Sequence, residues 1–99
     1  MYQRFEWDEN KNQRNIRKHK VSFELASRVF SDQFAYSYPE RIEDGEQRWQ
    51  TLGKVEGRVL LLVAHTIWDE DDSEVIRIIS ARPATAIETK RYEQENRYL

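Results

Sequence analysis

The sequence contains no cysteine, and only two prolines and three glycines occur among its 99 residues. Without cysteine, a disulfide scaffold, a cysteine nucleophile, an iron–sulfur cluster and the common structural zinc sites are excluded. Long apolar segments are missing too. The longest uninterrupted run, Val59 to Ala64, has six residues, whereas a membrane helix needs about 20. We therefore expect one domain over residues 1–99, located in the cytoplasm and without membrane contact.

An excess of charge of one sign is also missing, because 16 Lys and Arg stand against 18 Asp and Glu. This balance excludes a globally basic nucleic-acid-binding protein. The cations are nevertheless unevenly distributed, since residues 1–20 carry six of them against three acids. A local basic site on a nearly neutral body therefore stays possible. Three Trp, five Tyr and four Phe are enough aromatic residues to nucleate a core.

Hydrophobic periodicity and capping residues predict elements in the order β–α–α–β–β–β–β–α. The expected elements are a strand over Gln3–Trp7, a helix from Asp8 to about Lys18, a short helix after Ser22, strands over Phe34–Tyr38, Arg48–Leu52, Arg58–Thr66 and Val75–Ala81, and a helix from Thr85 to about Asn96. Residues 39–45 are expected to form a loop, residues 53–57 a hairpin turn in which both glycines have positive φ, and residues 69–73 an acidic turn. Short loops between strands favour an antiparallel meander with helices packed on it, which is an α+β fold.

The first predicted helix is unusual because Ile16 is its only apolar interior residue. Such a helix cannot bury a broad face, so we expect it to lie over an edge of the protein, with most of its surface available to solvent or ligand. Lys11, Asn15 and Lys18 share one face of this helix, with His19 beside them. These cations either complement the helix dipole or bind an anion.

Common catalytic motifs are absent from the sequence. It has no Walker A or GxGxxG phosphate loop, no HExxH and no GxSxG around Ser80. His19 lies among cations, His65 lies in a predicted strand, and the acidic run 70–72 lacks an EF-hand loop. We therefore expect neither a metal site nor a cofactor.

Three groups of basic residues remain as candidates. They are the cluster Arg14, Arg17, Lys18, His19 and Lys20 at the end of the first helix, Arg58 at the start of a strand, and Arg77 with Arg82 on the following strand. Arg77 interrupts an apolar run, so its guanidinium must face solvent, a carboxylate such as that of Glu46, or a ligand phosphate. Arg77 and Arg82 are five positions apart, and they reach one site only if Arg82 lies past the strand end or a β-bulge intervenes.

These groups suit the cleavage of RNA by its own 2′-hydroxyl. That reaction needs a base, an acid and cations that stabilise the phosphorane as charge develops. Arginine grips two phosphate oxygens at once, and the reaction requires neither metal nor cofactor. Exposed aromatic residues, among them Tyr36, Tyr38 or Tyr92, are candidates for stacking on bases.

Several stretches of the sequence resemble the BrnT family of bacterial type II toxins. The matching stretches are Trp7–Lys11, Asn15–His19, Val21–Phe23 with Ala26 and Val29–Phe30, Gly57–Leu60, Ile76–Ala84, Glu88 and Tyr92–Glu93. The resemblance implies a RelE-like fold with an antiparallel sheet, and a metal-independent endoribonuclease that arrests translation. It also implies a BrnA-type antitoxin with a ribbon-helix-helix segment, a heterotetramer with two of each chain, and operator DNA binding by the complex rather than by the toxin alone.

The resemblance also assigns residue roles. Carried over by position, the family's functional basic residues fall on Lys18, His19, Arg58, Arg77 and Arg82. We expect the guanidinium groups of Arg58 and Arg77 to converge on the scissile phosphate, and Lys18 or His19 to transfer a proton. Lys11, Lys20 and Arg82 are expected to bind RNA.

Lys20 departs from the family, which usually has glycine after the Lys-His pair. If this position is left-handed, a non-glycine residue costs on the order of 1 kcal/mol, but it also adds a cation. Two other functions fit the same sequence. One is a non-catalytic RNA- or protein-binding α+β module, and the other is a structural subunit that uses the acidic turn and the C-terminal helix as its interface.

Overall fold

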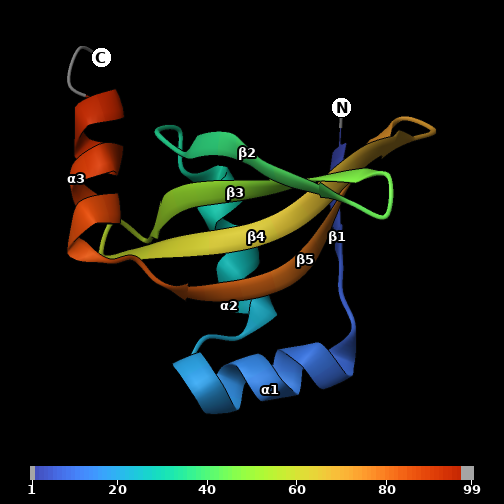
Figure 1. Ribbon diagram of the computed structural model, residues 1–99, viewed down its shortest axis with the longest axis horizontal. Coiled ribbons are helices and arrows are strands. Elements are labelled where there is room, and N and C mark those ends of the chain that lie inside the picture. The colour runs from blue at the N-terminus through green and yellow to red at the C-terminus, as the bar shows by residue number, and fades with distance from the viewer. Residues whose placement is uncertain (1, 97–99) are drawn as a thin grey trace.

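The fold is a five-stranded sheet with three α-helices and one 3₁₀ helix (Figure 1), seen in a computed structural model that describes residues 2–96. The strands are β1 (Tyr2–Glu6), β2 (Tyr36–Glu43), β3 (Glu46–Val55), β4 (Val59–Glu70) and β5 (Ser73–Pro83). The helices are α1 (Glu9–His19), α2 (Phe23–Ser27), η1 (Arg28–Ser31, 3₁₀) and α3 (Ala86–Glu95). This confirms the α+β class and the predicted order of elements.

The strand order in the sheet is β1-β5-β4-β3-β2. Strands β2 to β5 form the predicted antiparallel meander, but β1 pairs with β5 in parallel. The sheet is therefore mixed rather than wholly antiparallel, because the first strand lies beside the last one and runs in the same direction.

The two faces of the sheet are covered differently. Helices α2 and η1 cover one face, where Phe23, Val29 and Leu61 are fully buried. On the other face, α3 covers one end by packing Tyr92 near Leu52. We call the remaining part of this second face, around Gln50, Ala64 and Ser80, the open face.

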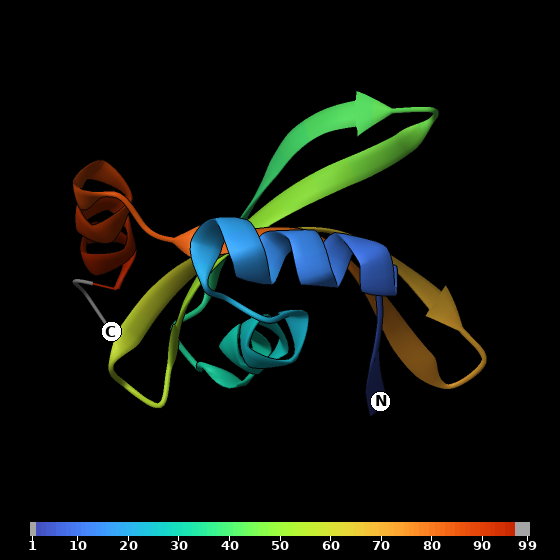
Figure 2. The same cartoon turned by 90° about the horizontal axis from the view of Figure 1, so that it is seen from below.

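Helix α1 takes the place of β1 along the edge of β5. The pairing of β1 with β5 ends at Arg77, and α1 then runs along the same edge (Figures 1 and 2). The Asn15 side-chain amide donates to the Ala81 carbonyl at 2.8 Å and accepts from the Ala81 N–H at 3.1 Å. The buried amide therefore satisfies the backbone groups that a neighbouring strand would otherwise satisfy. The predicted edge position is confirmed, although α1 is anchored by the buried Asn12 and Asn15 rather than by Ile16 alone.

A bulge in β5 decides which face carries the arginines. The β4–β5 register shifts between Ala64, opposite Ser80, and His65, opposite Ile78, so Ile79 has no partner on β4. Because side chains alternate along β4, the shift places Arg77 and Arg82 on the same face. The β-bulge that sequence analysis required for this arrangement is present.

Two local predictions were wrong. Residues 39–43 continue β2 instead of forming a loop, with Pro39 opposite Trp49; β2 is an edge strand, where proline is tolerated. Gly53 does not lie in the hairpin turn, which is instead made by Glu56 and Gly57 with φ of 55° and 67°. Gly53 lies within β3, where an added Cβ would stand 2.8 Å from the Cβ of Val29.

The ends of the chain elements follow their capping residues. Asp8, Ser22 and Thr85 cap α1, α2 and α3, and Thr85 forms the predicted capping box with Glu88. The acidic turn is tighter than predicted, because β4 extends to Glu70 and β5 begins at Ser73. None of the helices within residues 2–96 has the length and apolar character needed to cross a membrane.

Candidate active site

A pocket of about 320 Å³ opens on the open face, where the end of α1 meets β5. It is lined by Lys18 and His19 from α1, Gln50 from β3, Leu62 and Ala64 from β4, and Ser80, Ala81 and Arg82 from β5. Three of the predicted functional residues, Lys18, His19 and Arg82, therefore lie around one cavity. Ala81 and Leu62, which also line the pocket, are buried residues of the sheet.

The last turn of α1 is held by the Asn15 side chain before it and by the Lys20 cap after it. Asn15, one turn before Lys18 and His19, is bonded to Ala81 and also donates to the Val21 carbonyl at 2.8 Å. Lys20 ends the helix in the left-handed conformation, with φ 62°, and its N–H donates to the Ile16 carbonyl. These contacts fix the backbone from which Lys18 and His19 extend.

Arg82 is oriented by α3. Its two terminal nitrogens donate to the two Glu88 oxygens at 2.8 and 2.9 Å, and Nη1 also donates to the Pro83 carbonyl at 3.2 Å. The hydrogen bonds with Arg82 lower the pKa of Glu88, and those with Glu88 raise the pKa of Arg82. Three of the five N–H donors of a guanidinium are thus occupied, which leaves two for a ligand. Glu88 was not predicted as a site residue, although its capping box was.

Tyr38 and Arg91 lie at the neighbouring side of the open face. The Tyr38 hydroxyl donates to Oε1 of Gln50 at 3.2 Å, and the Arg91 guanidinium lies 4.1 Å from the Tyr38 ring centroid and 5.1 Å from that of Tyr36. Burial, followed by the Glu88 charge, raises the pKa of Tyr38. Of the three tyrosines considered for base stacking, Tyr92 is unsuitable because it is 5% exposed.

Arg77 lies on the same face of the sheet as the pocket but does not line it. It faces Thr66 on β4, four residues from the Leu62 that faces Arg82, so the two arginines are roughly 13 Å apart along the sheet. Its Nη1 is 2.9 Å from Glu6 Oε1. The partner is thus Glu6, from the parallel neighbour β1, and not Glu46.

Arg58 follows the β3–β4 turn at the other end of the sheet. Val59, the next residue, is seven positions along β4 from the Thr66 that faces Arg77, which corresponds to roughly 23 Å. The expectation that Arg58 and Arg77 converge on one phosphate is therefore wrong. Arg82, expected only to bind RNA, is the arginine that lines the pocket with Lys18 and His19.

The two histidines have different surroundings. His19 is partly exposed at the pocket, whereas His65 is 3% exposed in the core, 2.7 Å from the Thr51 hydroxyl and edge-on to Phe30. Burial lowers the pKa of His65 to about 4, so this imidazole is neutral and structural. Within residues 2–96, no three His, Asp or Glu side chains are grouped so that they could hold a metal ion.

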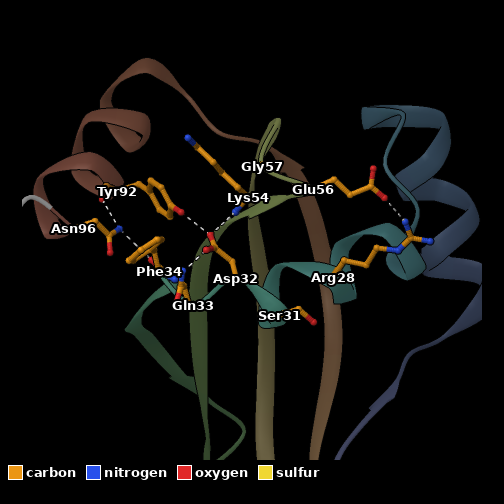
Figure 3. A pocket seen from close by; sticks show the side chains of 10 residues that line it. All are labelled: Arg28, Ser31, Asp32, Gln33, Phe34, Lys54, Glu56, Gly57, Tyr92 and Asn96. Carbon is orange, nitrogen blue, oxygen red and sulfur yellow. Dashed lines mark hydrogen bonds and ion pairs between the residues drawn. The ribbon is translucent and has the colours of Figure 1, made fainter. Parts of the chain in front are cut away.

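A larger pocket, of about 740 Å³, lies between η1, the β3–β4 turn and α3 (Figure 3). Asp32 accepts hydrogen bonds there from the Lys54 amide at 2.8 Å, the Tyr92 hydroxyl at 2.6 Å and the Phe34 amide at 2.9 Å. Burial opposes ionisation of Asp32, but these donors keep its pKa below the ordinary value. The polar groups of this pocket thus tie α3 to the body, and none of the basic residues predicted to be functional lines it.

Comparisons with known proteins identify the family and support the fold. Residues 7–88 match the family described as "Ribonuclease toxin, BrnT, of type II toxin-antitoxin system". The crystal structure of the Brucella abortus ribonuclease toxin BrnT is similar, with 26% sequence identity, a TM-score of 0.62, and coverage of 86% of this chain and 99% of that one. A search of curated proteins gave no match. The chain therefore belongs to the BrnT family of ribonuclease toxins of type II toxin–antitoxin systems.

Proposed function

We propose that this chain is a metal-independent endoribonuclease whose reactive groups are Lys18, His19 and Arg82. The observation that supports the proposal is the pocket in which the last turn of α1 meets the Arg82 guanidinium. Membership of a ribonuclease toxin family supports the choice of RNA as the substrate. Cleavage of cellular RNA would arrest translation and would place the site of action in the cytoplasm.

The proposed reaction uses the substrate's own nucleophile. The 2′-hydroxyl attacks the adjacent phosphorus, the bond to the 5′-oxygen breaks, and the products are a 2′,3′-cyclic phosphate and a 5′-hydroxyl. His19 or Lys18 accepts the 2′ proton, and the other group returns a proton to the leaving oxygen. The two unoccupied N–H groups of Arg82 bind the phosphorane oxygens as their charge grows. No step in this sequence requires a metal ion.

The other predicted basic residues have supporting roles in this proposal. Arg77 and Arg58 lie on opposite sides of the pocket along β4 and neither lines it, so we assign them to the phosphates that flank the scissile one. The ion pair with Glu6 makes Arg77 the weaker of these contacts. Lys20, next to His19 and exposed, adds positive potential at the pocket.

Incubation of the purified chain with total RNA in excess EDTA tests the proposal. We expect discrete fragments that end in a cyclic phosphate, and a rate loss of about 100-fold or more in both His19→Ala and Arg82→Lys, the usual range for a lost proton-transfer group or oxyanion donor. Arg41→Lys, an exposed arginine on β2, is the matched control and should keep the rate. Activity that disappears with EDTA would contradict metal independence. Binding without fragments would favour a non-catalytic module.

The partner follows from the same family. A type II toxin has an antitoxin partner, and we propose that it is a BrnA-type ribbon-helix-helix protein that assembles with this chain two to two. As the family resemblance implies, we propose that the complex, rather than this chain alone, binds the operator and represses its own operon. Co-purification with the product of the adjacent reading frame, followed by mass determination and operator mobility shifts with and without the antitoxin, tests each part.

A further inference from the structure

The unpaired cations of this protein are concentrated on α1. Among the lysines and arginines of residues 2–96, Arg4, Arg28, Arg41, Arg48, Arg77 and Arg82 form ion pairs. Of the nine others without a carboxylate at ion-pair distance, Lys54, Arg58, Lys90 and Arg91 are spread over β3, the β3–β4 turn and α3, and five lie on α1 and its cap. These five are Lys11, Arg14, Arg17, Lys18 and Lys20, and all are exposed.

Three of these cations form a row along one flank of the helix, which we call the α1 stripe: Lys11, Arg14 and Lys18. At 100° per residue, they lie within about 60° of one another around the axis, beside the anchored Asn15. Lys18 lines the pocket on the open face. The stripe therefore runs from the pocket back along the edge of the sheet, and Lys11 is roughly 10.5 Å from Lys18 along the helix axis.

The folded helix accounts for this row only in part, because the Asp8 N-cap attracts Lys11 and Arg14 but forms an ion pair with neither. The helix dipole favours cations in the last turn, which includes Lys18 but not Lys11 or Arg14. Like charges three and four residues apart repel one another, so the spacing of Lys11, Arg14 and Lys18 opposes helix formation. A bound polyanion removes that repulsion.

We infer that the α1 stripe binds the backbone of a single RNA strand and leads it into the pocket. The inference rests on the proposed function, and it adds the path and the form of the substrate. One row of cations follows one phosphate backbone, whereas a duplex presents two. The stripe carries lysine and arginine and no aromatic or amide side chain of its own that reads bases, so the contact is independent of sequence.

The binding test uses a 12-nucleotide single strand with 2′-O-methyl groups, which the protein cannot cleave. Each phosphate contact on a single strand contributes about 0.7 to the slope of log K against log salt, and thus about fivefold in affinity at 0.1 M salt. Lys11→Gln/Arg14→Gln should therefore lower the slope by about 1.4 and weaken binding by about 25-fold. The control Lys90→Gln/Arg41→Gln removes the same residue types from exposed positions on α3 and β2 and should leave the slope unchanged.

Cleavage kinetics provide the second readout. On a 12-nucleotide substrate, Lys11→Gln/Arg14→Gln should raise KM, and the defect should shrink as the substrate is shortened towards a dinucleotide that no longer reaches the stripe. Substrates that are shortened at one end at a time show on which side of the cleaved bond the stripe lies. Thermal unfolding of both double variants checks that the fold is intact, as expected for exposed positions.

The outcomes separate this inference from the proposed function. Equal slopes and equal KM in the double variant and the control would overturn the stripe, even if the wild type cleaves RNA. A lower slope in a protein that cleaves nothing would support the stripe and reject the nuclease. If the double variant keeps its RNA affinity but no longer binds the antitoxin, the stripe is a protein interface and the inference is wrong.

Discussion

Replacement of Asn15 by alanine is the most direct test of how α1 is held beside the site. The Asn15 amide is 7% exposed and makes three hydrogen bonds, two with Ala81 and one with Val21. Its removal leaves two carbonyls and one N–H without these partners. Each net hydrogen bond contributes about 1 kcal/mol, and an unsatisfied buried group costs about 1–3 kcal/mol. We therefore expect Asn15→Ala to lower the free energy of unfolding by about 3 kcal/mol.

Asn10→Ala is the matched control for this measurement, because Asn10 is exposed on the same helix and undergoes the same change in helix propensity. Urea unfolding at 25 °C gives both free energies. A domain of this size has roughly 5–15 kcal/mol in total, so Asn15→Ala should remain folded, with a midpoint temperature lower by roughly 15 °C. A difference of less than about 1 kcal/mol between the two variants would refute the reasoning, since water would then replace the amide.

The remaining predictions concern stability and are also measured by urea unfolding. His65 is neutral in the fold, because burial lowers its pKa to about 4 from an ordinary 6.5. The stabilisation that comes from burying the neutral ring is therefore fully present above pH 6.5, and it is lost as the pH falls towards 4. This loss amounts to roughly 3 kcal/mol in the free energy of unfolding. If the free energy of unfolding of His65→Gln fell with pH as steeply as that of the wild type between pH 6.5 and 4, the prediction would be wrong. Lys20→Gly relieves the left-handed φ of 62° and should raise the free energy of unfolding by about 1 kcal/mol; a decrease would show that the lysine side chain stabilises the cap. Gly53→Ala places a Cβ 2.8 Å from that of Val29 and should cost roughly 2 kcal/mol, whereas an unchanged value would mean that η1 shifts freely.

Local chemistry made the starts of the helices predictable. A capping residue acts on the backbone two or three positions away, so Asp8, Ser22 and Thr85 mark their helices in the sequence itself. Runs of apolar residues likewise identified β4 and β5. Pro39 misled the prediction because its effect depends on whether the strand is at an edge, and that property belongs to the sheet and not to the segment.

Long-range pairing was not predictable in this way. Glu6 and Arg77 are 71 positions apart, and their ion pair depends on β1 joining β5 in parallel. In the sequence Gly53 is typical of a turn, and only the packing of η1 against β3 shows that this position has no room for a Cβ. The two buried asparagines of α1 carry no apolar signal, so the packed side of the helix could not be recognised from periodicity.

The location of the pocket follows from a difference in strand length. β1 has 5 residues and β5 has 11, so the last part of β5 has no strand beyond it, and its backbone groups must be satisfied by something else. Helix α1 does this through one amide, that of Asn15 at Ala81, and the next turn of the helix brings Lys18 and His19 to the pocket. The β5 bulge lies in the same segment, and it turns Ser80 and Arg82 towards the side on which that turn opens. A longer β1 would cover this edge and a regular β5 would direct Arg82 into the core, so both irregularities are needed for Lys18, His19 and Arg82 to share one cavity.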